Sequence, residues 1–151
     1  CPFKTKCKAC QSGNPEAFPV KSGKSPRKKR WFYYLLIESK KGILIRERAG
    51  KDIWKHLYEF LLFERDEELD PRSVKAMIQQ YAGAAGMNFL QLTISDVYKQ
   101  QLSNQEISGR FIHLKTEDQI TVPVGYEWVK ESELKKFPFP RYILSYLMEK
   151  G

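Results

Sequence analysis

An abrupt change of character at Trp31 limits the possible fold more than any other feature of the sequence. Residues 11–30 contain three prolines, two glycines and three serines with little periodicity, which is typical of a linker. From Trp31 the chain continues with the apolar segment WFYYLLIE, a turn at SKKG and the segment ILIRER, in which we expect Ile43 and Ile45 to share a buried face. This pattern predicts a β-hairpin that opens a sheet.

A loop, a third strand and a helix are predicted after this hairpin. Residues 50–64 (GKDIWKHLYEFLLFE) predict a loop that enters another strand. Asp70 can then cap a helix whose first residue is Pro71 and which we expect to end at Gly83. The predicted buried face of this helix carries Val74, Met77, Ile78 and Tyr81.

The remaining residues predict more strands and a terminal helix. Residues 88–117 have a mostly β pattern with a break at LSNQ, and the expected buried positions are Ile107, Phe111 and Leu114. A last strand is predicted at residues 126–129, a helix start at Glu131 and Ser132, and an amphipathic helix in the closing segment PRYILSYLMEK. This order predicts an α+β domain with one mixed or antiparallel sheet and two or three helices.

The charge of the chain is concentrated at one end. Residues 1–48 hold thirteen Lys and Arg against three Asp and Glu, whereas residues 49–151 hold thirteen against fifteen. A basic segment on a nearly neutral domain favours a polyanionic partner such as nucleic acid, and a solvated lysine-rich linker is the alternative. The sequence has no run of eighteen apolar residues and no signal-peptide pattern, so we expect a soluble protein of a reducing compartment.

Three cysteines lie within the first ten residues, and no cysteine follows them. Cys7 and Cys10 have the spacing of one half of a zinc site, but His56 and His113 do not form a second half. A disulfide framework is not needed by a chain of 151 residues, which can bury its own core. Free thiols at a frayed terminus are the simplest alternative, and the absence of an initial methionine points to a fragment.

The helix at residues 71–83 permits a test for one enzyme class, the Nudix-type pyrophosphatases. Their metal ions are held by a carboxylate cluster in the helical motif R-E-x-x-E-E-x-G. When Gly83 is aligned with the last glycine of this motif, the arginine and the three glutamates are replaced by Ala76, Met77, Gln80 and Tyr81. The chain also lacks a Gly-rich phosphate loop and a G-x-S-x-G motif. We therefore expect no catalytic residues here and a binding module instead.

Several motifs together resemble the carboxy-terminal part of MutY-type adenine DNA glycosylases. They are CPFKTKC, FPVK, the aromatic first strand, G-x-x-I-W-x-x-L-Y-E-F, Y-K-x-x-L-S-x-Q and the closing E-x-E-L-x-x-F-x-x-P-R. The resemblance covers nearly the whole chain. It implies a Nudix/MutT-like domain at residues 31–151, a basic interdomain linker at 11–30 and, at 1–10, the end of an iron–sulfur cluster loop.

The resemblance implies a DNA-repair function. Enzymes of this family remove adenine mispaired with 8-oxoguanine, and their carboxy-terminal domain recognises the oxidised guanine. Cys1 and Cys7 would be the third and fourth ligands of a [4Fe–4S] cluster in the full-length protein, and no cluster is expected in this chain alone. Two alternatives remain: a stand-alone Nudix-type nucleotide pyrophosphatase, and a non-enzymatic interaction module.

The resemblance also implies which residues contact DNA. A family turn of the form Phe-Ser-His corresponds to Leu102, Ser103 and Asn104, which would meet the lesion. Phosphate contacts are expected from Lys99 and from the run Lys28, Lys29 and Arg30. The implied partner is double-stranded DNA that contains 8-oxoguanine paired with adenine. The implied protein is a monomer in the bacterial cytoplasm, with no membrane partner and no catalytic residue in this chain.

Overall fold

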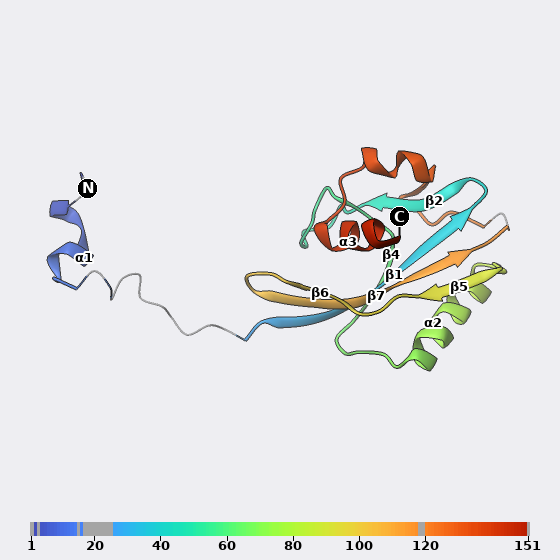
Figure 1. Cartoon of the computed structure of the whole chain (residues 1–151), viewed down its shortest axis with the longest axis horizontal. Coiled ribbons are helices and arrows are strands. Elements are labelled where there is room, and N and C mark those ends of the chain that lie inside the picture. Colours follow the sequence, from blue (N-terminus) through green and yellow to red (C-terminus); the bar gives the residue numbers. More distant parts are fainter. Residues whose placement is uncertain (1, 3, 15, 17–25, 118–119, 151) are drawn as a thin grey trace.

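The computed structural model describes residues 2, 4–14, 16, 26–117 and 120–150 (Figure 1). A short amino-terminal part precedes the sheet and contains η1 (Lys4–Lys6) and α1 (Lys8–Gln11). The other elements, in chain order, are β1 (Lys28–Ser39), β2 (Gly42–Glu47), β3 (Tyr58–Glu59), β4 (Leu61–Arg65), α2 (Pro71–Ala84), β5 (Gln91–Ile94), β6 (Tyr98–Gln101), β7 (Gln105–Lys115), β8 (Tyr126–Val129), η3 (Glu131–Lys136) and α3 (Arg141–Lys150).

The strands form a mixed sheet with β1 at its centre. β1 and β7 are parallel, whereas every other pair recorded among the described strands is antiparallel. The predicted hairpin of β1 and β2 closes with Ser39 opposite Gly42, and β4 takes the place of β2 beside the first half of β1. On the other side, β7 carries β6 along its first half and β5 along its second half. The α+β class with a mixed sheet is confirmed.

Two helices cover the two faces of this sheet (Figure 1). Alternate residues of β1 point to opposite faces, so Phe32, Tyr34 and Leu36 pack in one core cluster with residues of α3. Tyr33 and Leu35 pack in a second cluster with residues of α2. A strand that is buried on both faces is uniformly apolar, and this explains the run WFYYLLIE. The helices α2, α3 and the 3₁₀ helix η3 agree with the predicted two or three helices.

Helix α2 begins as the sequence predicts and ends slightly later. The Asp70 carboxylate accepts hydrogen bonds from the main-chain N–H groups of the second and third helical residues at 2.9 and 3.1 Å, which caps the helix. Val74 and Ile78 are buried in the core as expected. Gly83 is helical, and the left-handed glycine that follows the helix is Gly86, with φ of +62°.

Two further details differ from the sequence-based expectations. β1 starts at Lys28 and not at Trp31, because residues 28–30 pair with the first residues of β7. Residues 28–30 therefore belong to the sheet and not to the predicted linker. In β2, Leu44 is buried as completely as Ile43 and Ile45, because this strand also has a core cluster on each face. Within the described residues, no helix has the length and apolar character needed to cross a membrane.

Candidate nucleic-acid interface

The turn between β6 and β7 presents two exposed polar residues at the edge of the domain. Gln101 lies opposite Glu106, and the N–H of Leu102 donates to the carbonyl oxygen of Gln105 over 2.8 Å, which closes the turn. Ser103 and Asn104 are exposed at its tip. Leu102 is half-buried against the core cluster on the α3 side. Insertion of Leu102 into DNA therefore requires it to leave these contacts.

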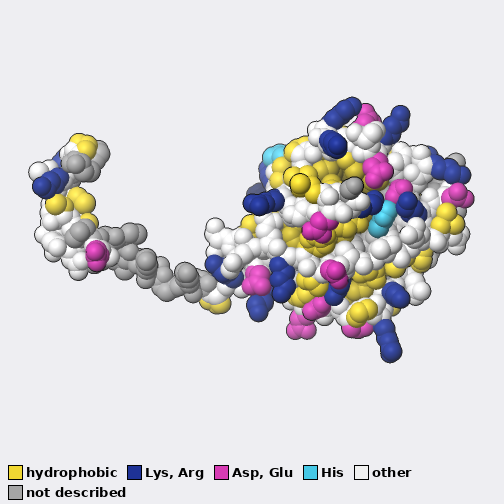
Figure 2. Space-filling model, in the orientation of Figure 1, with side chains coloured by type: hydrophobic (Ala, Val, Ile, Leu, Met, Phe, Trp, Pro, Cys, Tyr) yellow, Lys and Arg dark blue, Asp and Glu magenta, His cyan; other side chains and the backbone are white. Residues whose placement is uncertain are grey.

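The parallel pairing of β1 with β7 places predicted phosphate-binding residues beside this turn. The N–H of Lys28 donates to the carbonyl oxygen of Asn104 over 3.1 Å, and Lys29 lies opposite Glu106. Both lysine side chains are exposed, as is that of Lys99 on β6. Figure 2 shows Lys and Arg side chains gathered, with a few acidic ones, where β1 enters the globular part.

The two faces of the sheet both carry cations near the turn. Lys99 lies opposite Ser108, two residues after Glu106 on β7, so Lys99 and Lys29 share one face of the sheet. Lys28 points to the other face because neighbouring strand residues alternate. The exposed turn is thus flanked by positive charge on both faces.

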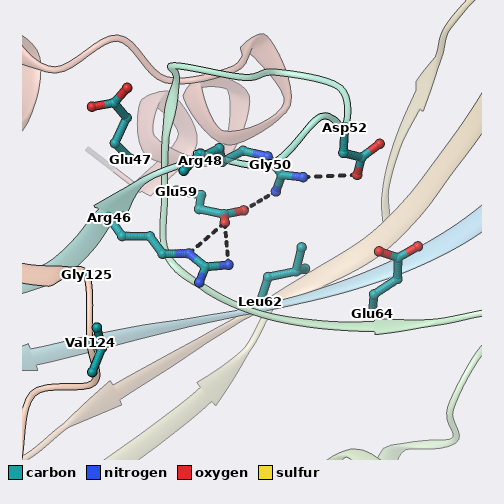
Figure 3. Close-up of a pocket in the computed structure, with 11 residues that line it drawn as sticks. Arg46, Glu47, Arg48, Gly50, Asp52, Glu59, Leu62, Glu64, Val124 and Gly125 are labelled. Atoms are coloured by element: carbon teal, nitrogen blue, oxygen red, sulfur yellow. Dashed lines mark hydrogen bonds and ion pairs between the residues drawn. The ribbon is translucent and has the colours of Figure 1, made fainter.

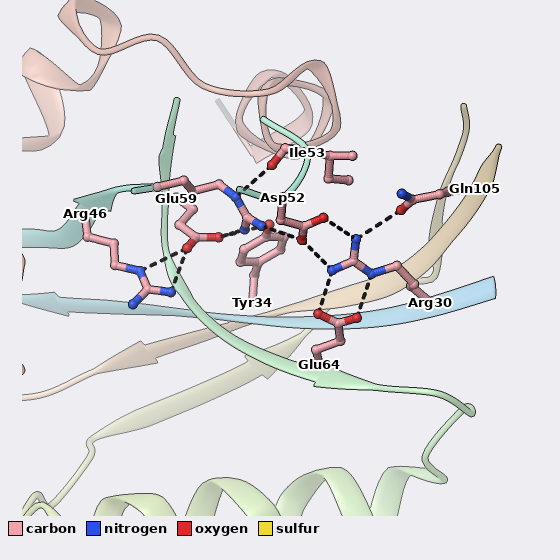
Figure 4. Close-up of polar contacts among 9 residues, drawn as sticks. Arg30, Tyr34, Arg46, Asp52, Ile53, Glu59, Glu64 and Gln105 are labelled. Atoms are coloured by element: carbon pink, nitrogen blue, oxygen red, sulfur yellow. Dashed lines mark hydrogen bonds and ion pairs between the residues drawn. The ribbon is translucent and has the colours of Figure 1, made fainter. Parts of the chain in front are cut away.

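Arg30 does not belong to this exposed basic surface, which argues against its predicted phosphate contact. Its side chain is buried, with 6% relative exposure, on the α3 side of β1. Its guanidinium donates to both carboxylate oxygens of Glu64 at 2.6 and 2.7 Å, to Asp52 at 2.6 and 2.9 Å, and to Gln105 at 3.0 Å (Figure 4). Hydrogen bonds to Glu64 and then to Asp52 hold the pKa of Arg30 above its ordinary value. Because its donors are occupied, Arg30 ties β1 to β4 and to the loop after β2.

A second part of the same network surrounds the buried carboxylate of Glu59, which is 1% exposed. Arg46 donates to it at 2.9 Å, Arg48 forms a further ion pair with it, and the Tyr34 hydroxyl lies 3.4 Å away (Figure 4). Burial raises the pKa of Tyr34 well above its usual range. Arg48 also pairs with Asp52 at 3.2 Å, which joins the two parts of the network. This network was not predicted from the sequence, although the alternation of Arg46 and Arg48 in ILIRER places both arginines on one side of the chain.

These charged residues line a hollow of about 430 Å³ between β2 and β4 (Figure 3). Its polar walls are Arg46 and Arg48 together with the carboxylates of Glu47, Asp52, Glu59 and Glu64. The carboxylates outnumber the arginines, and both guanidinium groups are already paired. This hollow is therefore electrostatically unsuited to a polyanion.

Of the three helix positions that would carry metal-binding glutamates, Met77 and Tyr81 contribute to packing instead, and Gln80 is exposed. Tyr81 packs its ring against that of Phe63 at a centroid distance of 5.5 Å, and burial raises its pKa. Met77 is partly buried in the same core cluster. Among the residues that the structure describes, no group of three or more His, Cys, Asp or Glu side chains could hold a metal ion.

The cysteines and histidines are not part of the turn at residues 102–104. Cys7 precedes α1 and has a free, partly exposed thiol, Cys10 is free and exposed, and Cys1 lies outside the described residues. A [4Fe–4S] cluster requires four ligands, which the three cysteines of the chain do not supply. His56 pairs with Glu47 at 2.9 Å, and His113 lies 2.5 Å from Glu38.

The mixed sheet packed between α2 and α3 defines the class of protein as a Nudix-fold domain, and its α2 does not carry the acidic motif R-E-x-x-E-E-x-G. Residues 32–149 match the family model described as the NUDIX domain, and the chain belongs to this family. No curated protein matches the chain.

Three solved structures illustrate the similarity in fold. The carboxy-terminal domain of mouse MUTYH, in a complex with human PCNA, is similar with a TM-score of 0.60 and 15% identity over 79% of this chain and 85% of that chain. The MutT protein of Methanosarcina mazei has a TM-score of 0.59 and 13% identity over 85% of this chain and 95% of its own. The NUDIX domain of Shewanella oneidensis NrtR, in a complex with ADP ribose, has a TM-score of 0.56 and 10% identity over 90% of this chain and 95% of that chain. At these identities the likeness shows a shared fold alone.

Proposed function

We propose that this chain is the lesion-recognition domain of an adenine DNA glycosylase, a base-excision-repair enzyme that removes adenine mispaired with 8-oxoguanine. The observation that carries the proposal is the position of Lys28 and Lys29 beside the turn at residues 102–104, with Lys99 on the adjoining strand. Lys28 and Lys29 are far from the turn in the sequence, and the parallel pairing of β1 with β7 brings them beside it.

Ser103 is the residue that reads the oxidised base in this proposal. In 8-oxoguanine, N7 carries a hydrogen and C8 carries a carbonyl oxygen, so the altered edge offers one donor and one acceptor. A serine hydroxyl can accept from the first and donate to the second. Ser103 is exposed at the tip of the turn, where a base edge can reach it. Asn104 beside it replaces the histidine of the family turn and supplies an amide with the same dual capacity.

Leu102 and the lysines have different tasks. Leu102 acts as an apolar wedge between base steps, as such side chains do in proteins that unstack DNA, once it leaves its half-buried position. Lys28, Lys29 and Lys99 neutralise backbone phosphates, which supplies affinity without sequence information. Arg30 supports them indirectly because it fixes the start of β1.

Catalysis belongs to another domain of the glycosylase in this proposal. The chain itself binds the strand that carries the lesion and hydrolyses nothing. In the longer protein, Cys1 and Cys7 would complete a [4Fe–4S] cluster together with two further cysteines. We place the enzyme in the bacterial cytoplasm as a DNA-bound monomer.

Both kinds of structural neighbour bear on the choice between repair domain and hydrolase. The similarity to the mouse MUTYH domain supports the first function, and the similarity to MutT allows the second. The replacement of the three expected glutamates on α2 by Met77, Gln80 and Tyr81 favours the repair domain, because hard divalent metals need several oxygen ligands.

Fluorescence anisotropy of the 151-residue chain with labelled duplexes tests the proposal. We expect tighter binding to a duplex with 8-oxoguanine opposite adenine than to one with guanine opposite adenine, at the same salt concentration. Equal affinities would contradict lesion recognition. Magnesium-dependent hydrolysis of an oxidised nucleoside triphosphate, abolished by a point mutation in this chain, would establish the hydrolase instead.

A further inference from the structure

A second hollow, of about 370 Å³, lies next to the turn and differs in charge from the first. It is bounded by residues 98–101 of β6 and by Arg141, Tyr142 and Ser145 of α3, and we call it the β6–α3 groove. Its lining residues, as the structure describes them, include two cations and no carboxylate. The hollow between β2 and β4, in contrast, is rich in carboxylates.

The groove borders an open edge of the sheet. Within the described part of the chain, β6 pairs with β7 alone, so its other edge faces α3. The Tyr142 hydroxyl donates to the carbonyl oxygen of Tyr98 over 3.3 Å and fixes the floor of the groove. Arg141 and Ser145 lie one helical turn apart on the same side of α3, and the Ser145 hydroxyl donates to the carbonyl oxygen of Arg141 at 3.0 Å.

One polar atom of the groove lacks a partner. The side-chain oxygen of Gln100 is buried and has no hydrogen-bond donor, which is so for only one other buried side-chain polar atom of the described residues, Nε1 of Trp128. Buried acceptors are nearly always satisfied in folded proteins. A ligand in the groove that carries an N–H or O–H group would supply the missing donor.

The geometry points to the β6–α3 groove as a second contact site for the DNA strand, in which Arg141 binds one phosphate and Gln100 accepts a hydrogen bond from a base N–H of the adjoining nucleotide. This inference rests on the proposed function, because it takes the strand held by the turn as its ligand. Lys99–Gln101 directly precede Leu102 in the chain, so a DNA strand that contacts the turn passes along the groove. Arg141 matches phosphate geometry with its planar donors.

A peptide strand fits the groove less well. Addition of a strand to β6 needs the free main-chain edge of β6, but α3 lies beside that edge and Tyr142 already occupies the Tyr98 carbonyl. A peptide would have to displace α3 from the core, where Tyr142, Ile143 and Tyr146 are buried. A nucleic-acid strand requires no main-chain pairing with β6, since its phosphate can reach the exposed Arg141 and its bases carry the N–H groups that Gln100 needs.

Nuclear magnetic resonance of the labelled 151-residue chain, combined with salt-dependent binding, tests the groove. In a titration with the 8-oxoguanine duplex, we expect shifts at the Gln100 side-chain amide and the Arg141 Nε–H, in addition to the Ser103 amide. Arg141→Gln should lower affinity equally for the oxidised and the unmodified duplex. It should also reduce the slope of log affinity against log salt by about 0.9, the value for one phosphate.

Two further variants separate binding from folding. Arg72→Gln removes an exposed arginine of α2 and should leave affinity and slope unchanged. Gln100→Leu should weaken DNA binding without lowering the Tm, because it removes an acceptor that is unpaired in the free chain. A lower Tm with unchanged affinity would instead assign Gln100 to the fold and overturn its part in the site.

The outcomes distinguish this inference from the proposed function. Shifts at the turn alone, with an unchanged slope in Arg141→Gln, overturn the groove and leave lesion recognition standing. Shifts at the groove with equal affinity for both duplexes support the groove and contradict lesion recognition. No binding to either duplex overturns both, and binding of an extended peptide at β6 would then identify a protein-interaction module.

Discussion

The main-chain N–H of Lys28 donates a hydrogen bond to the carbonyl oxygen of Asn104 over 3.1 Å. This bond joins the start of β1 to the tip of the β6–β7 turn. The positions of the basic residues and of the exposed Ser103 therefore depend on one register, that of the parallel pair β1–β7.

Gly109 tests this register. It lies opposite Phe32, and an added Cβ would come within 1.8 Å of the Phe32 carbonyl oxygen. We expect Gly109→Ala to lower the free energy of unfolding by about 3 kcal/mol, at the upper end for overpacking, because neither backbone can retreat. Urea denaturation measures the change.

Gly83→Ala is the matched control for this substitution. Gly83 lies in α2, and an added Cβ meets nothing within 4 Å. It should stabilise the chain by about 1 kcal/mol through helix propensity. If Gly109→Ala were as stable as the wild type, β1 and β7 would not pair as described.

Arg30 should behave as a structural residue and not as a DNA contact. Arg30→Gln leaves Asp52 and Glu64 without their cation, and we expect a loss of about 3 kcal/mol of stability, the low end for breaking a buried ion pair, since both carboxylates retain solvent. Under conditions where the variant is folded, its DNA affinity should show the wild-type salt slope. A slope reduced by one phosphate would show that Arg30 reaches DNA.

The network around Arg30 also predicts a loss of stability in acid. A hydrogen bond from Arg30 lowers the pKa of Asp52 from 3.8 to about 2 in the folded chain. The folded pKa lies below the unfolded value, so the stabilisation is fully present above pH 3.8 and is lost as the pH falls towards 2.

Denaturation at several pH values tests this prediction. The free energy of unfolding, measured with urea between pH 5 and 2.5, should fall more steeply with decreasing pH for the wild type than for Asp52→Asn. Parallel curves for the two proteins would mean that the pair does not form.

The exposed lysines should affect DNA binding without affecting lesion preference. Lys28→Gln and Lys29→Gln should each weaken binding to oxidised and unmodified duplexes by the same factor and reduce the salt slope by about one unit per lost phosphate contact. Lys55→Gln, on the exposed loop between β2 and β3, is the control and should change neither quantity. A changed ratio between the duplexes would place lesion recognition at the lysines.

Local signals predicted the elements of this fold well. The cap at Asp70 and the spacing of Val74 and Ile78 depend on residues within one or two helical turns, so the sequence alone contains the information. The burial of Ile107 and Phe111 likewise follows from strand alternation.

Long-range pairing was beyond the same reasoning. Arg30 stands in a run of cations that resembles a basic linker, but its partners Asp52, Glu64 and Gln105 are 22, 34 and 75 residues away. Whether a cation in such a run is buried depends on which strand pairs in parallel with its own, here β7. The chain between β1 and β7 is long, and no local pattern in the sequence shows that these two strands pair. Lys29, its neighbour, points the other way and remains exposed.

Substitution of Ser103 tests the central claim most directly. The ratio of affinities for duplexes with 8-oxoguanine and with guanine opposite adenine should be measured for the wild type, Ser103→Ala and the control Ser132→Ala, an exposed serine of η3. Lesion recognition predicts that only Ser103→Ala reduces this ratio, while its affinity for the unmodified duplex stays nearly constant. The difference in binding free energy between the two duplexes should shrink by about 1–3 kcal/mol, the cost of a lost base-edge contact. An unchanged ratio in Ser103→Ala would contradict the assignment of the β6–β7 turn as the reader of the oxidised base.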